Sequence, residues 1–140
     1  FGDPEAQAII PRMQSDLLPI LKAAAEGDLK GLQAQWKKDP AVCVVMASEG
    51  YPGSYETGFV IEGIEKVDQS VPGKTAVFHA GTAYKDNKLV TAGGRVLGVT
   101  AWDNDLKSAV GRVYQAADQI HFDGCYYRRD IAHRALKRLR

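Results

Sequence analysis

Two adjacent glycines followed by an arginine, Gly93-Gly94-Arg95, form the stretch of this sequence best suited to binding an anion. Glycine allows positive φ angles, and successive N–H groups in such a turn can converge on an oxyanion. A neighbouring guanidinium adds planar, charged donors that suit phosphate. The same residues also fit a hairpin turn followed by a solvent-exposed arginine, because Gly-Gly turns are common between paired strands. The spacing alone favours the plain turn, and the phosphate site stays open as the alternative.

A basic run and a glycine-containing loop are weaker candidates. Residues 128–140 contain six basic side chains and one acid, and a solvent-exposed helix face near a chain end explains most of them. Arg128 and Arg129 differ from the rest, because they precede the helix that Asp130 is expected to cap. Residues 49–53, Glu-Gly-Tyr-Pro-Gly, form either an ordered binding loop or a turn that ends a strand, and the sequence favours neither.

Metal and redox chemistry have little support in the sequence. The three histidines His79, His121 and His133 are far apart and show no metal-ligand spacing with either cysteine, so we assign no metal site. Cys43 lies within an apolar run and is expected to be a small core residue. Two distant cysteines, Cys43 and Cys125, do not form a disulfide framework and fit a reducing cytoplasm.

Hydrolase chemistry and nucleotide-loop motifs are also unsupported. Ser48 and Ser108 have no recognisable partners for a nucleophilic triad. The sequence has neither a Walker loop nor a G-x-G-x-x-G motif after a strand. These motifs leave an α+β domain with one candidate phosphate-binding turn.

The composition is that of one globular domain. The chain has 140 residues, of which 45% are hydrophobic and 25% are charged, and its formal net charge is +1. This charge gives no reason to expect nucleic acid or an acidic membrane as a partner. The apolar runs are too short to cross a bilayer, and no secretory segment is recognisable. Because the sequence opens on Phe1 rather than Met, we expect a piece of a longer polypeptide.

Helices are expected before and after a central group of strands along the chain. Asp3-Pro4-Glu5 is a typical helix start, with Asp3 as the cap, and Pro11 limits that helix to about two turns. A second helix is predicted from Ser15-Asp16 to Gly27, and a short amphipathic segment over residues 28–37. The clearest helix covers residues 104–118, where apolar residues recur at i, i+3, i+4 and i+7. A last short helix is expected from Asp130, with its apolar residues, Leu139 among them, towards the core.

The strands are expected to form an antiparallel meander. Residues 41–47 are apolar and β-branched enough for a buried strand. Residues 75–84, 88–92 and 95–102 follow as three strands with short connections, and parallel pairs would need long crossovers. Residues 58–64 form either a short strand or an open turn, and residues 122–127 are expected to be extended. The expected fold class is α+β.

Four segments of the chain closely resemble the C-terminal third of the phosphoribosylamine–glycine ligases, also called glycinamide ribonucleotide synthetases. In chain order they are FGDPEAQAIIPRMQSDLL, VVMASEGYPGSYETG, VFHAGTAYKDNKLVTAGGRVLGVTAW and ADQIHFDGCYYRRDIAHRAL. The resemblance covers nearly the whole chain in the right order, which makes it more specific than any single motif.

The resemblance implies two parts with different origins. Residues 1–30 resemble the closing helices of an ATP-grasp domain. Residues 31–140 resemble the family's C-terminal domain, a small barrel-like antiparallel sheet with flanking helices, similar to the hybrid-motif domain of biotin carboxylase. The family's metal ligands, a Glu and an Asn, precede the matched FGDPE motif, so they would lie upstream of Phe1. ATP and magnesium or manganese would therefore bind the full-length enzyme, and no cofactor or metal is expected on this fragment.

The resemblance also implies a function. The family joins 5-phosphoribosylamine and glycine through a glycyl phosphate, giving glycinamide ribonucleotide, ADP and phosphate, in cytoplasmic purine biosynthesis. Its last domain folds over the active site and helps to hold the acceptor, so the resemblance now favours the phosphate site at Gly93, Gly94 and Arg95. Asp3 and Pro4 are the next candidates for touching phosphoribosylamine or glycine. Arg128 and Arg129 are possible supports for these residues, and no catalytic residue is expected in the fragment.

Three hypotheses follow. In the first, the chain is a fragment of this ligase, inactive without its N-terminal and ATP-grasp domains. In the second, it is a stand-alone module that binds a phosphorylated metabolite. In the third, it is a purely structural domain of an ATP-grasp ligase or carboxylase.

Overall fold

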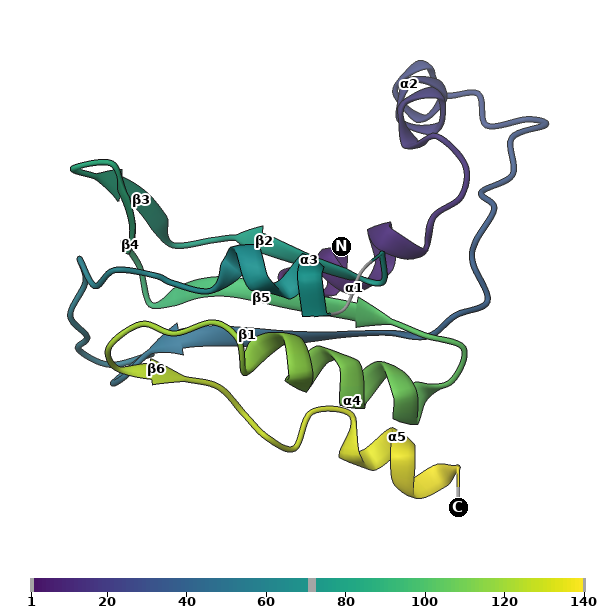
Figure 1. The fold of residues 1–140 in the computed structure, drawn as a ribbon. Coiled ribbons are helices and arrows are strands. Elements are labelled where there is room, and N and C mark those ends of the chain that lie inside the picture. Colours follow the sequence, from purple (N-terminus) through teal and green to yellow (C-terminus); the bar gives the residue numbers. More distant parts are fainter. Residues whose placement is uncertain (1, 71–72, 140) are drawn as a thin grey trace.

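An antiparallel sheet with helices on both faces forms the centre of the molecule (Figure 1). The computed structural model describes residues 2–70 and 73–139. The four strands lie in the order β2-β5-β1-β6. Their bounds are Ala41–Ser48 (β1), Thr75–His79 (β2), Arg95–Trp102 (β5) and Cys125–Tyr126 (β6). The α+β class predicted from the sequence is therefore confirmed.

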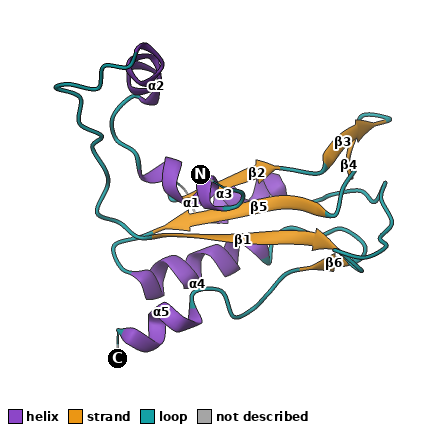
Figure 2. Ribbon diagram, turned by 180° about the vertical axis from the view of Figure 1, so that it is seen from behind, coloured by secondary structure: helices purple, strands orange, loops and turns teal. Residues whose placement is uncertain are grey.

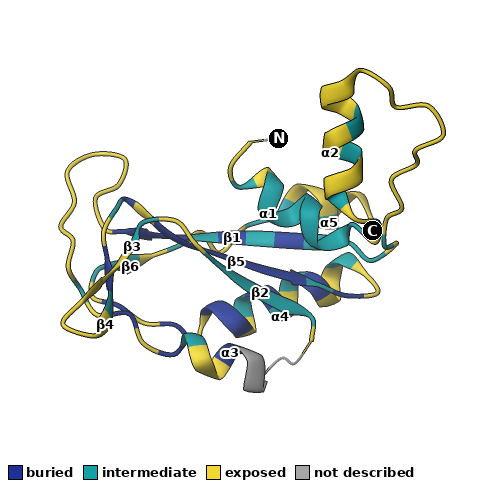
Figure 3. Ribbon diagram, turned by 90° about the horizontal axis from the view of Figure 1, so that it is seen from above, coloured by how far each residue is buried: buried dark blue, intermediate teal, exposed yellow. Residues whose placement is uncertain are grey.

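The two long central strands form the hydrophobic core with the helix beneath them. β1 and β5 pair antiparallel, with Val44 opposite Val99 and Val45 opposite Gly98. Alternate residues of β1 face the same side, so Val42, Val44 and Met46 are buried while Cys43 and Val45 are half-buried on the opposite face. The dark strands in Figure 3 mark this buried centre.

Helix α4, Leu106–Ala117, covers the buried face of the sheet along most of its length (Figure 2). Asp105 caps its first turn by accepting a hydrogen bond from the Ser108 amide. One stripe of small and β-branched side chains is fully buried against the sheet and consists of Ala109, Val113, Ala116 and Ala117. This helix, predicted from its 3.6-residue periodicity, is confirmed.

The predicted meander is wrong, because the strand expected over residues 75–84 breaks in the middle. β2 ends at His79 and pairs with β5, whereas β3 (Thr82–Lys85) pairs with β4 (Lys88–Thr91) in a separate two-stranded sheet. Asp86 and Asn87 form the hairpin turn with positive φ angles, as expected. The chain therefore leaves one sheet after β2 and returns to it at β5, and the hairpin projects from the main sheet (Figure 1).

The N-terminal helices differ from the sheet region in burial. α1 (Glu5–Ile9) continues into a short 3-10 helix, η1 (Ile10–Arg12), and packs on the face of the sheet opposite α4. α2 (Leu17–Glu26) begins at its Asp16 cap and ends at Gly27, as predicted. It has no buried residue, and it stands away from the sheet with mostly exposed side chains (Figure 3).

Three helix predictions need correction. Residues 28–37 form turns and loop rather than a helix, held by a bridge between Met13 and Trp36. Helix α3 (Ile64–Ser70) was not predicted, although its Val67 joins the core. α5 (His133–Arg138) starts later than expected, because the Asp130 carboxylate pairs with Arg128 instead of capping.

The two chain ends add little to the core. Leu139 is 72% exposed rather than directed to the core. Phe1 and Arg140, which the sequence interpretation included, lie outside the described residues. Both cysteines are free thiols, as expected. Over residues 2–70 and 73–139, no helix is long and apolar enough to span a membrane.

Candidate anion site

The structure brings Asp3 and Arg95, 92 positions apart in the chain, into an ion pair. Asp3 Oδ2 lies 3.0 Å from Arg95 Nη2, and Arg95 Nη1 donates to the Asp3 carbonyl at 3.4 Å. Asp3 was expected to cap α1, but its carboxylate accepts from the Gln7 side chain and from Arg95, and the first turn has no side-chain cap. About half of each paired side chain is exposed, 42% for Arg95 and 47% for Asp3.

Gly81 is required by a crossing of two chain segments, and Gly93 is its neighbour there, where a Cβ on Gly93 would lie 3.1 Å from the Gly81 Cα. A Cβ built on Gly81, where the chain leaves β2 for β3, would lie 2.7 Å from the Gly93 Cα and 2.6 Å from the Arg95 carbonyl oxygen. The Gly81 carbonyl also accepts from the Ala92 amide. Neither Gly93 nor Gly94 has a φ angle in the left-handed region, so the positive-φ nest expected from the sequence is wrong. Close backbone approach is what calls for glycine here.

Gly94 is required by an aromatic side chain. A Cβ at this position would overlap the ring of Tyr51, which approaches from the loop after β1. Tyr51 meets Tyr55 edge to face, with ring centroids 6.1 Å apart. Residues 49–53 are thus an ordered loop that packs on the candidate site.

Ser48 fixes the orientation of both glycine carbonyls. Its amide donates to the Gly94 carbonyl at 2.8 Å, and its hydroxyl donates to the Gly93 carbonyl at 3.0 Å. Ser48 is only 4% exposed. The amide N–H groups of Gly93 and Gly94 have no hydrogen-bond acceptor among the described residues. The bend therefore has fixed carbonyls and two unpaired donors next to Arg95.

A cavity of about 250 Å³ lies on the half-buried face of the sheet beside this bend. Pro4 and Tyr51 line one part of it, and Arg128 lines another, where its guanidinium pairs with Asp130 at 2.8 Å. Arg129 is turned away towards α4. It lies over the Tyr127 ring at 4.5 Å and pairs with Asp118 at 2.8 Å.

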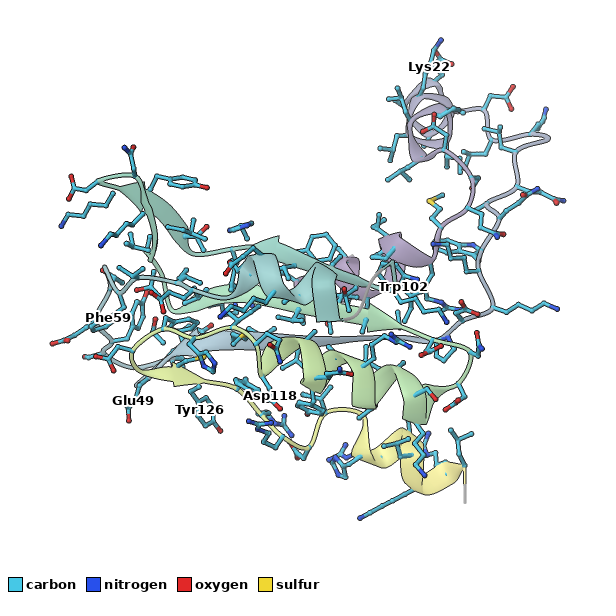
Figure 4. All side chains as sticks on the ribbon, in the orientation of Figure 1. Lys22, Glu49, Phe59, Trp102, Asp118 and Tyr126 are labelled. Carbon is cyan, nitrogen blue, oxygen red and sulfur yellow. The ribbon has the colours of Figure 1, made fainter. Side chains whose placement is uncertain are left out.

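Other residues of the same loop line a second cavity of about 460 Å³. Three carboxylate residues line it, together with Tyr55 and Phe59: Glu49, Glu56 and Asp123. Figure 4 shows Glu49, Phe59 and Tyr126 at one end of the molecule, with Trp102 at the other. The 48–55 loop thus contributes to both an acidic cavity and a largely apolar one.

The two cysteine thiols and the Tyr127 hydroxyl near these cavities are held in their protonated forms. Burial raises the pKa of the Cys125 thiol to about 11 and also raises the pKa of Cys43, so both remain protonated at neutral pH. Burial and then a hydrogen bond to Asp118 raise the pKa of Tyr127 to about 12. In the described part of the chain, no group of three or more His, Cys, Asp or Glu residues is arranged to hold a metal ion.

Taken as a class, this is an α+β domain that presents one half-exposed arginine and two unpaired amides at a glycine bend. Residues 41–134 match the family described as "Phosphoribosylglycinamide synthetase, C domain". The chain belongs to this family. The resemblance noted in four sequence segments is thereby confirmed.

Curated relatives match over almost the entire chain. The chain is 48% identical over 132 residues to a phosphoribosylamine–glycine ligase of Caldanaerobacter subterraneus, covering 94% of this chain and 30% of that protein. It is 49% identical to the chloroplastic ligase of Arabidopsis thaliana, covering 98% and 26%, and 46% identical to that of Pseudomonas aeruginosa, covering 100% and 32%. The chain thus spans about a third or less of these relatives' length.

A solved structure supports the same relationship. The chain superposes on a phosphoribosylamine–glycine ligase of Thermotoga maritima with a TM-score of 0.77 and 34% identity. The match covers 93% of this chain and 31% of the other. Sequence and fold therefore lead to the same family.

Proposed function

We propose that this chain is the C-terminal part of an ATP-grasp phosphoribosylamine–glycine ligase. The full-length enzyme would join 5-phosphoribosylamine and glycine into glycinamide ribonucleotide, with conversion of ATP to ADP and phosphate through a glycyl phosphate. The observation that carries this proposal is the identity of nearly half of all residues to named ligases over 94–100% of the chain. ATP and magnesium or manganese would bind outside this chain, and its partners would be the N-terminal and ATP-grasp domains.

We assign the two parts of the chain to different domains of that enzyme. Residues 1–30 would be the closing helices of the ATP-grasp domain, and residues 31–140 would be the C-terminal domain with a barrel-like sheet. Two bridges support the barrel. Val60 pairs with Val90 in the small sheet, and Glu62 pairs with His121 before β6, so residues 60–62 link the two regions. The exposed α2 supports the division, because its apolar side chains Leu18 and Leu21 are 70% and 56% exposed, as expected for a helix that packs against another domain.

The residues of the bend would hold the phosphate of phosphoribosylamine. Arg95 offers planar charged donors, and its partner Asp3 is exposed enough to release it. The unpaired Gly93 and Gly94 amides would add neutral donors. Asp3 and Pro4, beside the bend and its cavity, would contact the acceptor or glycine. These residues would position the amine for attack on the acyl phosphate, and the catalytic groups would come from the other domains of the enzyme.

Substitution of Arg95 in the full-length ligase tests this site. Arg95→Ala should raise the KM for phosphoribosylamine about tenfold to a hundredfold, because it removes charged hydrogen bonds to phosphate. The KM of Arg95→Lys should lie between those of the wild type and Arg95→Ala, since lysine keeps the charge but lacks the planar guanidinium. Arg134→Ala, an exposed arginine on α5, is the matched control. An unchanged KM with intact folding would refute the site and support the purely structural alternative.

The fragment itself is expected to be inactive, because the metal ligands of the family would lie outside it. A purified 140-residue chain should show no glycine-dependent ATP hydrolysis. Hydrolysis above the background of a chain-free control would contradict this and favour a stand-alone module. The cytoplasmic location, and the absence of nucleic-acid and membrane partners, remain part of the same proposal.

A further inference from the structure

Two residues at the end of β1 and in the loop after it, Ser48 and Tyr51, contact the glycine bend. Neither is among the residues expected to bind substrate. We propose that Ser48 and Tyr51 are positioning residues that fix the Gly93-Gly94 bend and Arg95 for the phosphate of the acceptor. This inference rests on the proposed function, and it adds two residues to the acceptor site. Neither residue needs to touch the substrate.

Ser48 acts through the two carbonyls of the bend. A single side chain and its own amide bind consecutive carbonyl oxygens, at 3.0 and 2.8 Å. Each carbonyl shares its peptide plane with the N–H of the next residue, so these two bonds also fix the direction of the Gly94 N–H and of the Arg95 N–H. A serine at the end of a core strand is otherwise unexpected, because its polar side chain is almost fully buried.

Tyr51 acts through shape. Its ring occupies the volume that any side chain at Gly94 would need, so the ring and the bend can approach only because Gly94 has no Cβ. The Gly81 crossing supports Gly93 through a second close backbone approach. The bend is therefore confined by the ring at Gly94 and by the neighbouring backbone at Gly93, and it cannot relax without moving one of them.

The position of Arg95 makes this confinement relevant to binding. Arg95 is the first residue of β5 and lies opposite Ala47, next to a register shift between Met46 and Ala47. Ser48 follows directly on the facing strand. A change in the bend is therefore passed to the Arg95 backbone within one residue. A bend ordered before binding spares the acceptor the cost of ordering it.

Kinetics of the full-length ligase test the inference. Ser48→Ala should raise the KM for phosphoribosylamine about threefold to tenfold, with kcat and the KM for ATP nearly unchanged. Ser48→Thr keeps the hydroxyl and should restore most of the loss. Tyr51→Leu should give a similar rise, and Tyr51→Phe, which keeps the ring, should not. Ser54→Ala in the same loop is the control, since its hydroxyl has no partner among the described residues.

The outcomes separate this inference from the proposed function. If Arg95→Ala raises the KM for phosphoribosylamine while Ser48→Ala and Tyr51→Leu do not, the positioning role is wrong and the site stands. If all variants lose kcat and thermal stability together, with no rescue by Ser48→Thr, the two residues are merely structural. If the wild-type full-length protein makes no glycinamide ribonucleotide, the proposed function itself fails.

Discussion

Strand β5 has a carboxylate–guanidinium pair at each end, and the two pairs differ in burial and in number of partners. Just after its last residue, Asp103 binds Lys74 Nζ at 2.6 Å and Arg112 Nη2 at 2.6 Å, and its side chain is only 10% exposed. At its first residue, Arg95 binds Asp3 at 3.0 Å, and close to half of each side chain is in solvent. The carboxylate at one end of the strand is buried and has two cationic partners, whereas the carboxylate at the other end is half exposed and has one.

The difference indicates which arginine can accept a ligand. Arg112 directs Nε and Nη2 to a single carboxylate oxygen, and Lys74 occupies the other oxygen, so Asp103 ties α4 and the segment before β2 to the sheet. These contacts hold the pKa of the Asp103 carboxyl well below its usual range, first through Lys74, then through the Asn104 amide and Arg112. The partner of Arg95, Asp3, is about half exposed, so their ion pair contributes little free energy. An incoming phosphate can therefore take the place of the Asp3 carboxylate at small cost.

Removal of the Asp103 carboxylate should give the largest effect. Asp103→Ala leaves Lys74 and Arg112 facing each other without a counter-charge, so we expect the melting temperature of the chain to fall by roughly 10 °C. Thermal unfolding followed by circular dichroism measures this. Asp123→Ala, at an exposed carboxylate outside any ion pair of the described residues, should leave the midpoint nearly unchanged. If Asp103→Ala melted at the same temperature as Asp123→Ala, the Asp103 ion pairs would not stabilise the fold, and the two ends of β5 would not differ in the way described.

Local sequence patterns were enough to predict the elements on which both pairs are built. The apolar, β-branched run of β1, the periodic stripe of α4 and the turn at Asp86-Asn87 each depend on near neighbours in the chain, and all three elements are confirmed. The glycine pattern gave Arg95 as a site candidate, and the resemblance to the ligase family favoured it and added Asp3. Their mutual contact spans 92 positions, and no local pattern encodes it.

Pairing across long distances is what the sequence could not provide. Short connections suggested that β4 would pair with β5, but the chain changes sheets at Gly81 and again at Gly93. The presence of glycine at both points was the available signal, since close approach of two backbones requires it. Ser48 was considered only as a nucleophile, and its role in holding the bend depends on a partner 45 positions away.

Acid should lower the folding stability of the wild type more than that of Asp103→Ala, because only the wild type has the Asp103 carboxylate. The folded state holds the pKa of Asp103 below its usual range, so the unfolded chain takes up a proton that the folded chain refuses as pH falls below about 4. The contribution of Asp103 is complete above that pH and decreases below it. The stability gap between wild type and Asp103→Ala should therefore narrow between pH 6 and pH 3, measured by urea unfolding. A gap that stays constant would mean that the Asp103 charge does not supply the stabilisation.

Loss of the exposed pair should give the smallest effect. Asp3→Asn removes one charge from a pair that solvent already screens, so the free energy of unfolding should change by less than about 1 kcal/mol. Urea unfolding at low and at high salt measures this, and the small difference should shrink further as salt increases. Arg134→Gln, on an exposed arginine of α5, serves as the matched surface control. A loss as large as that of Asp103→Ala would show that Asp3 and Arg95 form a structural tie, in which case Arg95 would not be available to a phosphate. A loss near zero leaves the Arg95 guanidinium held only weakly, which is the property that an exchangeable anion site requires.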